Sequence, residues 1–459
     1  MEKLLILGIN TRAIVNSGLK LDYILFSASY FSTLDFKAPY LEKHILNQKS
    51  GKTCQYFETN YSYEKLLDIS KEMLDEVDHI ILSTGISPID FKGEFKKYKK
   101  KIIGNKNTEA VEDKYKFYKK IKNKFLTPKT FKISQTNISD AMEIAKQYDD
   151  KEFIIKPLQG SGGYGVKHLN YSKSNDFKAI DLENQYSNHE DFNPPFFDNQ
   201  CHNYEDFDFI VQEFIPGPNI SSSVLGSKKE VKAISNSIML TEADFGIKNS
   251  FKYCGNIVPL DINILKKFKS DNSYTIFNEQ RINNKFMNIS ENTIAKTQDI
   301  NTVAKKPTAK TQDINEISED LIANFKLIGS NGVDMIINND NIYIIEINPR
   351  FQGTYELVEN VLRINLLESH IKACNNELIT IPTPKGYSVK KIIYTKEKSV
   401  IGNLAIENVY DVPYNGVIIE KNQPLATVIT QDNQINKAIS KVEIATKKIN
   451  DRISFINSK

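Results

Sequence analysis

The chain has 459 residues, of which 40% are hydrophobic and 25% charged, and its formal net charge is +3. This length leaves room for two to four domains with a sizeable core, and the composition is ordinary for a folded globular protein. The small net charge argues against a nucleic-acid partner. No hydrophobic run approaches the length of a membrane span, so we expect no membrane partner either.

The four cysteines, Cys54, Cys201, Cys254 and Cys374, are far apart and lack metal-ligand spacing. Their positions argue against a zinc site and against a disulfide scaffold. The first residues begin a strand and have no signal-peptide pattern. We therefore expect a cytoplasmic protein.

The first hundred residues alternate between buried-strand patterns and helical patterns, which predicts a Rossmann-like sheet. Only Gly8 follows the first strand, so a nicotinamide fingerprint is missing. Arg12 lies where such sheets bind ligands, and the alternative is a surface arginine without a ligand. The predicted elements are strands at 4–9, 23–27, 79–83 and 101–104, and helices ending at 17 and spanning 63–75.

The next segment predicts a second compact unit. A helix is expected over 107–122 with Lys114 near its middle, and another over 139–148 with Ser139 as its cap. A strand over 152–156 follows and ends at Lys156.

A glycine-rich loop comes directly after this strand, and Gly160, Gly162 and Gly165 match the spacing G-x-G-x-x-G. Such a loop lets backbone amides approach phosphate oxygens. A dinucleotide fingerprint would open a helix, but residues 166–169 have a strand pattern, and the Walker and kinase motifs are missing. The pattern predicts a strand–loop–strand flap over a nucleotide. The alternative is a flexible glycine hairpin.

Two polar stretches, 170–208 and 266–315, predict surface insertions without regular structure. The second contains Lys-Thr-Gln-Asp-Ile-Asn twice, at 296–301 and 310–315, which we interpret as slippage rather than as a solenoid repeat. Other expected elements are strands at 211–217, 219–225, 233–240, 389–394, 416–420 and 424–429, and helices at 317–328, 356–373 and 433–450.

Residues 332–350 contain two apolar runs on either side of an Asn- and Asp-rich turn, which predicts a β-hairpin. If the turn is centred on Asp340, Asp334 on the first strand lies directly opposite Glu346 on the second. We expect the two carboxylates to share one face of the hairpin.

Asn348 and Arg350 lie on the same face as Glu346, because side chains alternate along a strand. Two carboxylates and an amide oxygen are ligands that suit Mg²⁺, and Arg350 offers a fork for a phosphate or carboxylate. The alternative is an edge hairpin whose polar face is in water.

Taken together, these pieces resemble the ATP-grasp superfamily over about residues 1–375. Five motifs occur in the family's order and spacing, which makes the resemblance far more specific than any one motif. They are Lys114, the Ile155-Lys156-Pro157 run with the Gly-Ser-Gly-Gly-Tyr-Gly loop, residues 212–217, Asp334, and residues 346–350. Residues 219–223, 251–259 and 332–335 resemble one subgroup, the predicted ATP-dependent carboligases, which are similar to carboxylate-amine ligases.

The resemblance implies an ATP site. Lys114 and Lys156 would hold the ATP phosphates from two sides, and the backbone at Glu213 and Ile215 would receive the adenine edge. The implied nucleotide-binding residues also include Gly160, Ser161, Gly162, Gly163, Gly165, Gln212 and Phe214.

The resemblance also implies a catalytic metal site. Asp334, Glu346 and Asn348 would bind Mg²⁺ or Mn²⁺, with Glu346 bridging two ions. Arg350 would grip the transferred phosphoryl group or an acyl phosphate and, with Lys156, act as a catalytic residue. One position departs from the family pattern, because Asn219 stands where many members carry a glutamate.

The implied fold class is α/β (α+β), an ATP-grasp fold. We expect a Rossmann-like pre-ATP-grasp domain at 1–105, a small α/β lid subdomain at 106–215, a metal-binding subdomain at 216–379 and a strand-rich antiparallel C-terminal subdomain at 380–459. The insertion at 266–315 falls within the third.

The implied function is an ATP-dependent ligase that activates a carboxylate as an acyl phosphate for attack by an amine. Two alternatives stay open at this point: carboxyphosphate chemistry with bicarbonate, and a nucleotide-binding regulatory module without turnover. The expected partners are small-molecule carboxylates and amines, with either a monomer or a homodimer as the assembly. The substrates themselves are not encoded in any motif.

Overall fold

The computed structural model describes residues 1–36, 40–134, 138–148, 151–158, 160, 162–169, 208–247, 250–261, 264 and 309–456. Of the insertion at 170–208, only residue 208 is described. The first copy of the six-residue repeat, at 296–301, lies outside the described residues. No helix in the described ranges is long and apolar enough to cross a membrane.

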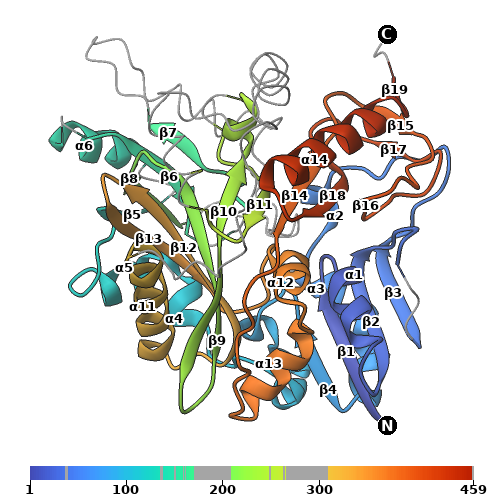
Figure 1. The fold of residues 1–459 in the computed structure, drawn as a ribbon, viewed down its shortest axis with the longest axis horizontal. Coiled ribbons are helices and arrows are strands. Elements are labelled where there is room, and N and C mark those ends of the chain that lie inside the picture. Colours follow the sequence, from blue (N-terminus) through green and yellow to red (C-terminus); the bar gives the residue numbers. More distant parts are fainter. Residues whose placement is uncertain are drawn as a thin grey trace, which may run out of the picture.

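The N-terminal region forms a parallel sheet of four strands in the order β3-β2-β1-β4 (Figure 1). Apolar side chains cover both of its faces, as expected for parallel strands. The elements are β1 Glu2–Gly8, α1 Arg12–Gly18, β2 Tyr23–Phe31, β3 Leu41–Leu46, α2 Phe57–Asn60, α3 Tyr63–Glu76, β4 His79–Leu82, and the 3₁₀ helices η1 Pro88–Asp90 and η2 Gly93–Lys101.

The strand predicted at 101–104 is wrong. Only an isolated bridge joins Ile80 to Ile102, and Gly104 has a φ of +130°, which turns the chain away from the sheet. This turn carries the chain from the parallel sheet toward the rest of the molecule.

A second, antiparallel sheet has the strand order β5-β8-β6-β7. The antiparallel pairing of β6 with β7 confirms that the glycine-rich loop joins two strands. Helix α6 packs against this sheet and begins at Ile138, so the predicted cap Ser139 lies inside its first turn. The elements are β5 Thr130–Ser134, α6 Ile138–Gln147, β6 Phe153–Pro157, β7 Lys167–Leu169 and β8 Asp208–Glu213.

A helix predicted over 107–122 is two helices, α4 Glu109–Glu112 and α5 Lys114–Ile121. Asp113 separates them, because its side chain accepts hydrogen bonds from the backbone N–H groups of Tyr115 and Lys116 and caps the second helix. Lys114 is therefore the first residue of a helix rather than a residue in the middle of one.

The largest sheet has eight strands in the order β13-β12-β9-β10-β11-β14-β18-β16. Its C-terminal strands thus continue the sheet that carries the hairpin. The elements are β9 Asn219–Gly226, β10 Val231–Thr241, η5 Glu242–Phe245, β11 Tyr253–Val258, α11 Ala309–Asn324, β12 Gly329–Asn338, β13 Asn341–Asn348, α12 Tyr355–Leu362, α13 Leu366–Cys374, β14 Tyr387–Tyr394, β16 Val409–Tyr410, β18 Pro424–Asp432 and α14 Ile435–Asn450. A small sheet joins β17 Ile418–Ile419, β15 Ser399–Ile401 and β19 Ile453–Phe455.

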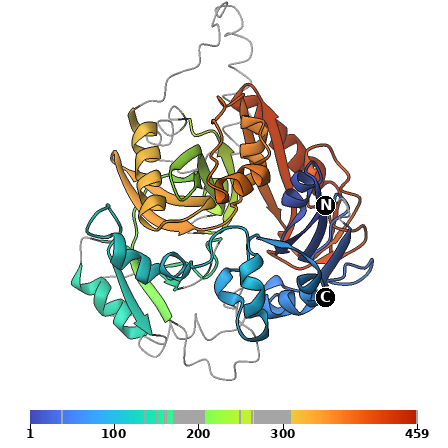
Figure 2. The same ribbon diagram turned by 90° about the horizontal axis from the view of Figure 1, so that it is seen from below.

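Helices cover the two faces of the eight-stranded sheet differently. Helices α11 and α14 share one core with it, whereas α12 and α13 lie between it and the parallel sheet (Figures 1 and 2). The single helix predicted at 356–373 is wrong, because Arg363 has a φ of +56° and separates α12 from α13. Residues 309–315, which we expected to be unstructured, begin helix α11, and Ile314 is buried in its core.

Candidate active site

The hairpin of β12 and β13 has the predicted turn. Asn339 and Asp340 have φ values of +44° and +71°, a left-handed conformation that Asn and Asp tolerate. A two-residue turn alone would place Asp334 opposite Ile345. A bulge after Asp334 shifts the register by one residue, so Asp334 pairs with Glu346. The predicted pairing is confirmed, and the bulge is its physical cause.

The bulge brings the two acidic side chains together on one face. Asn348 donates from Nδ2 to Asp334 Oδ2 at 2.8 Å, which adds the predicted third ligand to the pair. Burial and the neighbouring Glu346 carboxylate raise the pKa of Asp334 to about 7. The hairpin therefore holds two carboxylates that repel each other and would be stabilised by a cation.

Two lysines face these carboxylates. Lys156 is 6% exposed, and burial lowers its pKa to about 8, with Glu346 acting in the opposite direction. Lys114 lies with its Nζ 3.9 Å from Glu346 Oε2, and burial lowers its pKa as well. Arg350 is close enough for its positive charge to act on the pKa of both Lys114 and Asp334, in the lowering direction. The structure thus brings together the lysines, the carboxylates and the arginine singled out in the sequence.

The glycine-rich loop lies against both sides of this site. The Lys114 ammonium donates to the Gly160 carbonyl at 2.8 Å, and the Tyr253 N–H donates to the Gly162 carbonyl at 3.0 Å. Gly163 has a φ of +76°, and a Cβ there would lie 1.9 Å from the Phe251 carbonyl oxygen. Ser161 is outside the described residues. The loop follows the neighbouring backbone closely and can do so because it has no side chain at Gly163.

We call residues 212–217, which begin with the last two residues of β8, the hinge. Two of its side chains make contacts that stabilise the fold. Gln212 donates from Nε2 to Thr130 Oγ1 at 2.9 Å, which holds it within the lid sheet. The Glu213 carboxylate accepts from the Lys129 N–H at 3.0 Å and pairs with Lys151. The side chains of Gln212 and Glu213 are thus occupied by contacts within this sheet, and the role of their backbone toward a base edge stays a prediction.

An aromatic cluster surrounds the predicted residue Phe214, and its member His168 was missed from the sequence. The ring centroids of His168 and Phe214 are 4.6 Å apart, and those of His168 and Phe251 are 4.9 Å apart. The three rings come from β7, from the hinge and from the segment before β11. No sequence spacing connects these segments, although strand alternation in β7 could have placed His168 on one face.

A row of polar side chains inside the large sheet was also missed as part of the site. Ser221 lies opposite Asp334 in the neighbouring strand, and Ser237 lies opposite Ser221. Asn256 donates to Ser237 Oγ at 3.2 Å and accepts from the Tyr253 hydroxyl. The Asn219–Gly226 strand, with three serines amid apolar residues, carried the signal for this row.

Arg12 is neither a surface residue nor a free ligand-binding group. It is 2% exposed, and its guanidinium donates to Asp411 at 2.7 Å and to Glu356 at 2.8 and 3.0 Å. Asp35 lies 3.3 Å away. These contacts join the parallel sheet to α12 and to the C-terminal strands, so Arg12 has a structural role at this junction.

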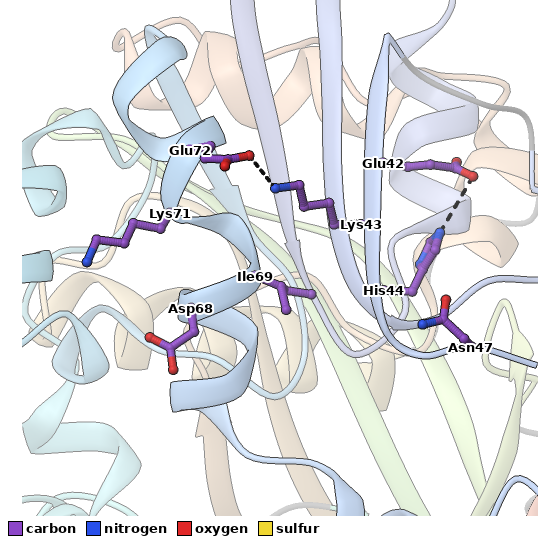
Figure 3. A pocket seen from close by; sticks show the side chains of 8 residues that line it. All are labelled: Glu42, Lys43, His44, Asn47, Asp68, Ile69, Lys71 and Glu72. Atoms are coloured by element: carbon purple, nitrogen blue, oxygen red, sulfur yellow. Dashed lines mark hydrogen bonds and ion pairs between the residues drawn. The ribbon is translucent and has the colours of Figure 1, made fainter.

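A cavity of about 530 Å³ lies elsewhere, between β3 and α3 (Figure 3). Figure 3 shows Lys43 paired with Glu72 and His44 turned toward Glu42. None of the predicted site residues lines it. Within the described ranges, no group of three or more His, Cys, Asp or Glu side chains has the geometry of a complete metal site. The hairpin itself contributes two carboxylates, those of Asp334 and Glu346.

The model of the ATP-grasp domain family matches residues 111–276 and 268–354, which together span more than half of the chain. The chain belongs to the ATP-grasp family. An uncharacterized protein of Methanocaldococcus jannaschii is 29% identical over 437 residues, covering 94% of this chain and 88% of that protein. The tyramine–L-glutamate ligase of the same organism is 27% identical over 241 residues, covering 52% of this chain and 48% of the ligase.

Solved structures of ATP-grasp enzymes share the whole fold. The biotin carboxylase domain of Hydrogenobacter thermophilus 2-oxoglutarate carboxylase, crystallised with MgADP, ADP and bicarbonate, has a TM-score of 0.65 at 14% identity, covering 99% of this chain and 91% of that one. N5-carboxyaminoimidazole ribonucleotide synthetase from Thermotoga maritima has a TM-score of 0.57 at 15% identity, covering 99% and 100%. The predicted fold class is confirmed. The subgroup, the domain boundaries and the site residues stay predictions.

Proposed function

We propose that this protein is an ATP- and Mg²⁺-dependent ligase that activates a carboxylate for attack by an amine. The observation that carries the proposal is the Asp334–Glu346 pair on β12 and β13, which faces Lys114 and Lys156 in a partly buried site. The Glu346 carboxylate and burial raise the pKa of Asp334, so a cation would stabilise this pair, and the buried ammonium groups would be stabilised by an anion. Magnesium ions with a nucleoside triphosphate satisfy both needs at once.

In this proposal, the chain binds ATP mainly through its backbone and its lysines. The amides of the glycine-rich loop cradle the phosphates, while Lys114 and Lys156 approach them from two sides. The adenine edge meets the backbone at Glu213 and Ile215, and the rings of Phe214 and His168 lie beside it.

Asp334, Glu346 and Asn348 would hold Mg²⁺, which would neutralise the phosphate charge during transfer. Glu346 would be the central ligand of this set, because it lies opposite Asp334 and also near Lys114, which would approach the phosphates. Arg350 lies two residues beyond Asn348, the last residue of β13, and its guanidinium can stabilise the charge on the phosphoryl group during transfer.

The reaction requires positioning and charge neutralisation rather than a protein nucleophile. An oxygen of the substrate carboxylate forms a bond to the γ-phosphorus of ATP as the bond to the departing ADP oxygen breaks. The amine nitrogen then forms a bond to the acyl carbon, the carbon–oxygen bond to phosphate breaks, and the nitrogen loses a proton. The partial match to a ligase that joins an amine to an amino acid supports this class of acceptor.

The proposal is tested by measuring ADP release with pooled organic carboxylates and amines in the presence of Mg²⁺. We expect ADP only when a carboxylate is present and stoichiometric product only when an amine is present as well. ADP formed with bicarbonate alone would support carboxyphosphate chemistry instead. Tight ATP binding without ADP under every pool would indicate a regulatory module and contradict the proposal.

Matched variants identify the site. Glu346→Gln should abolish ADP release, whereas Lys132→Ala in β5 of the lid sheet should not change it. Equal activity of wild type and Glu346→Gln would show that the chemistry takes place elsewhere.

A further inference from the structure

The chain leaves the parallel sheet beside the open end of the metal-site hairpin. Ile103 still donates to the Ile80 carbonyl of β4 at 2.9 Å, and Gly104 then turns the chain. The next residue, Asn105, reaches the start of β12 and the end of β13. This crossing lies at the open end of the hairpin, opposite its exposed turn at Asn339 and Asp340.

The Asn105 side chain makes three hydrogen bonds at this crossing. Its side chain is 8% exposed, and Nδ2 donates to Asn331 Oδ1 at 2.8 Å and to the Pro349 carbonyl at 3.1 Å. Its Oδ1 accepts from the Ile328 N–H at 2.8 Å. One amide thus binds both strands of the hairpin, and the carbonyl that it holds is in the peptide bond that leads into Arg350.

His370 makes a second connection from α13. Its ring is 5% exposed, Nδ1 accepts from the Ser330 N–H at 2.8 Å, and Nε2 lies 3.1 Å from the Ile103 carbonyl. The first contact requires an unprotonated Nδ1, so the second is a hydrogen bond donated by Nε2. The ring also contacts Phe351 at 4.7 Å between centroids, directly after Arg350.

Glycines form the slot for this ring. A Cβ at Gly329 would lie 2.5 Å from His370 Cε1, and a Cβ at Gly104 would lie 3.3 Å from the same atom. Both glycines have positive φ values, +69° and +130°. The chain therefore leaves out side chains at two positions to admit the imidazole between the parallel sheet's exit and β12.

We propose that Asn105 and His370 are positioning residues that fix Arg350 and the Asp334–Glu346 pair relative to the N-terminal parallel sheet. This inference rests on the proposed function. The two side chains join three segments: the exit from the parallel sheet, the start of β12 and the end of β13. In open parallel sheets, ligands bind beyond the carboxyl ends of the strands. We call Asn105 and His370 together the clamp. The clamp therefore sets the distance between a substrate bound at the parallel sheet and the groups that stabilise phosphoryl transfer.

Positioning matters here because the reaction has no protein nucleophile. A displacement of about 1 Å in a group that stabilises the transition state can cost about a hundredfold in rate. Loss of the clamp should therefore slow turnover more than it weakens ATP binding, since the lysines, the glycine-rich loop and the hinge belong to other segments.

Asn105→Asp tests the clamp, because it keeps the shape and the acceptor but loses both donated hydrogen bonds. The matched control is Asn236→Asp, which removes the 2.7 Å hydrogen bond from a buried asparagine in β10 to Asn315. We expect kcat for ADP release to fall at least tenfold in Asn105→Asp with KM for ATP within twofold. The control should keep both constants within twofold of wild type. A fall in kcat shared by both variants would reduce the role to general stability and overturn the proposal.

Hydrogen exchange provides a readout that does not depend on catalysis. In the ligand-free protein, exchange over residues 346–354 should become at least fivefold faster in Asn105→Asp and unchanged in Asn236→Asp. His370→Phe, which fills the slot without the two hydrogen bonds, should have the same effect if Asn105→Asp does not fold. Unchanged exchange over 346–354 in the folded clamp variants would overturn the clamp even if wild type is an active ligase. Faster exchange without any ADP release from wild type would support the clamp and contradict the ligase function.

Discussion

The hairpin and the glycine-rich loop approach the same site with opposite designs. The hairpin holds its charged groups on paired strands inside an eight-stranded sheet, and its open end is bound to the parallel sheet by Asn105 and His370. The loop has no charged side chains of its own between Gly160 and Gly165. Its described contacts to other segments include the carbonyls of Gly160 and Gly162, bound by Lys114 and Tyr253.

This difference follows from what each part has to do. Groups that stabilise a transition state must be fixed before the reaction begins, because any reorganisation adds to the barrier. A cradle for phosphates must open to admit the nucleotide and then close. A rigid sheet suits the first task, and a glycine loop between two short strands suits the second. The following predictions test this contrast, beginning with the largest expected effect.

Glu346→Gln should cause the largest loss, at least a hundredfold in ADP release, because it removes the charge that would hold two ions. Asp334→Asn and Asn348→Ala should be milder and partly rescued by excess Mg²⁺ or by Mn²⁺. Folding should survive in all three, since removing crowded carboxylates is neutral or stabilising without metal. Melting curves and ADP release across a Mg²⁺ titration check this order. Equal metal dependence of wild type and Glu346→Gln would contradict the metal site.

Lys156→Ala should weaken ATP binding by about 2–4 kcal/mol, because the ammonium meets a phosphate in a site with little solvent. Calorimetry with ATP and Mg²⁺ measures the change. Lys132→Ala, in strand β5 of the same sheet, is the control and should bind ATP like wild type. An unchanged affinity in Lys156→Ala would exclude the lysine from the phosphate site.

His370, which contacts the open end of the hairpin, should make the stability of the fold depend on pH. Burial lowers the pKa of His370 to about 4 from an ordinary value of 6.5. Between pH 6.5 and pH 4, His370 is therefore protonated in the unfolded chain and neutral in the folded chain. Stability should therefore decrease as the pH falls from 6.5 toward 4, by about 3 kcal/mol from this group. His370→Phe cannot bind the proton.

The measurement is the free energy of unfolding of wild type and His370→Phe between pH 7 and pH 4. The difference between them should shrink as the pH falls, because only wild type loses the contribution of this residue. A constant difference over the whole range would show that His370 is protonated without cost in the folded state.

Gly163→Ala should produce the smallest of these effects, about a tenfold weaker affinity for ATP. Its Cβ would collide with the Phe251 carbonyl, so the loop would have to move away from β11. Gly51→Ala is a close control, because Gly51 has a similar φ of +74° but open space around it. Both variants pay the cost of a positive φ, and only the first should affect nucleotide binding. Similar affinities in the two variants would mean that close approach of the loop is unnecessary.

The glycine loop should also respond to the nucleotide more than the hairpin does. Hydrogen exchange over residues 160–169 should slow when ATP and Mg²⁺ are added, whereas backbone exchange in β12 should change little. Indifference of the loop to the nucleotide would argue against a flap.

Local chemistry in the sequence determined much of the site. The turn at Asn339 and Asp340, the alternation along β12 and β13, and the strand on each side of the glycine-rich loop are short-range patterns. Their physical causes, turn conformation and side-chain period, act within a few residues and can be read without a fold. The order of the five motifs then indicated the family, which the family model confirmed.

Only the tertiary structure decided where the remaining residues act. Arg12 reaches carboxylates on segments more than three hundred positions away, and Asn105 reaches Pro349 across 244 positions. Such contacts depend on which surfaces the packed sheets and helices bring together. A side chain's own neighbours in the sequence carry no information about that packing.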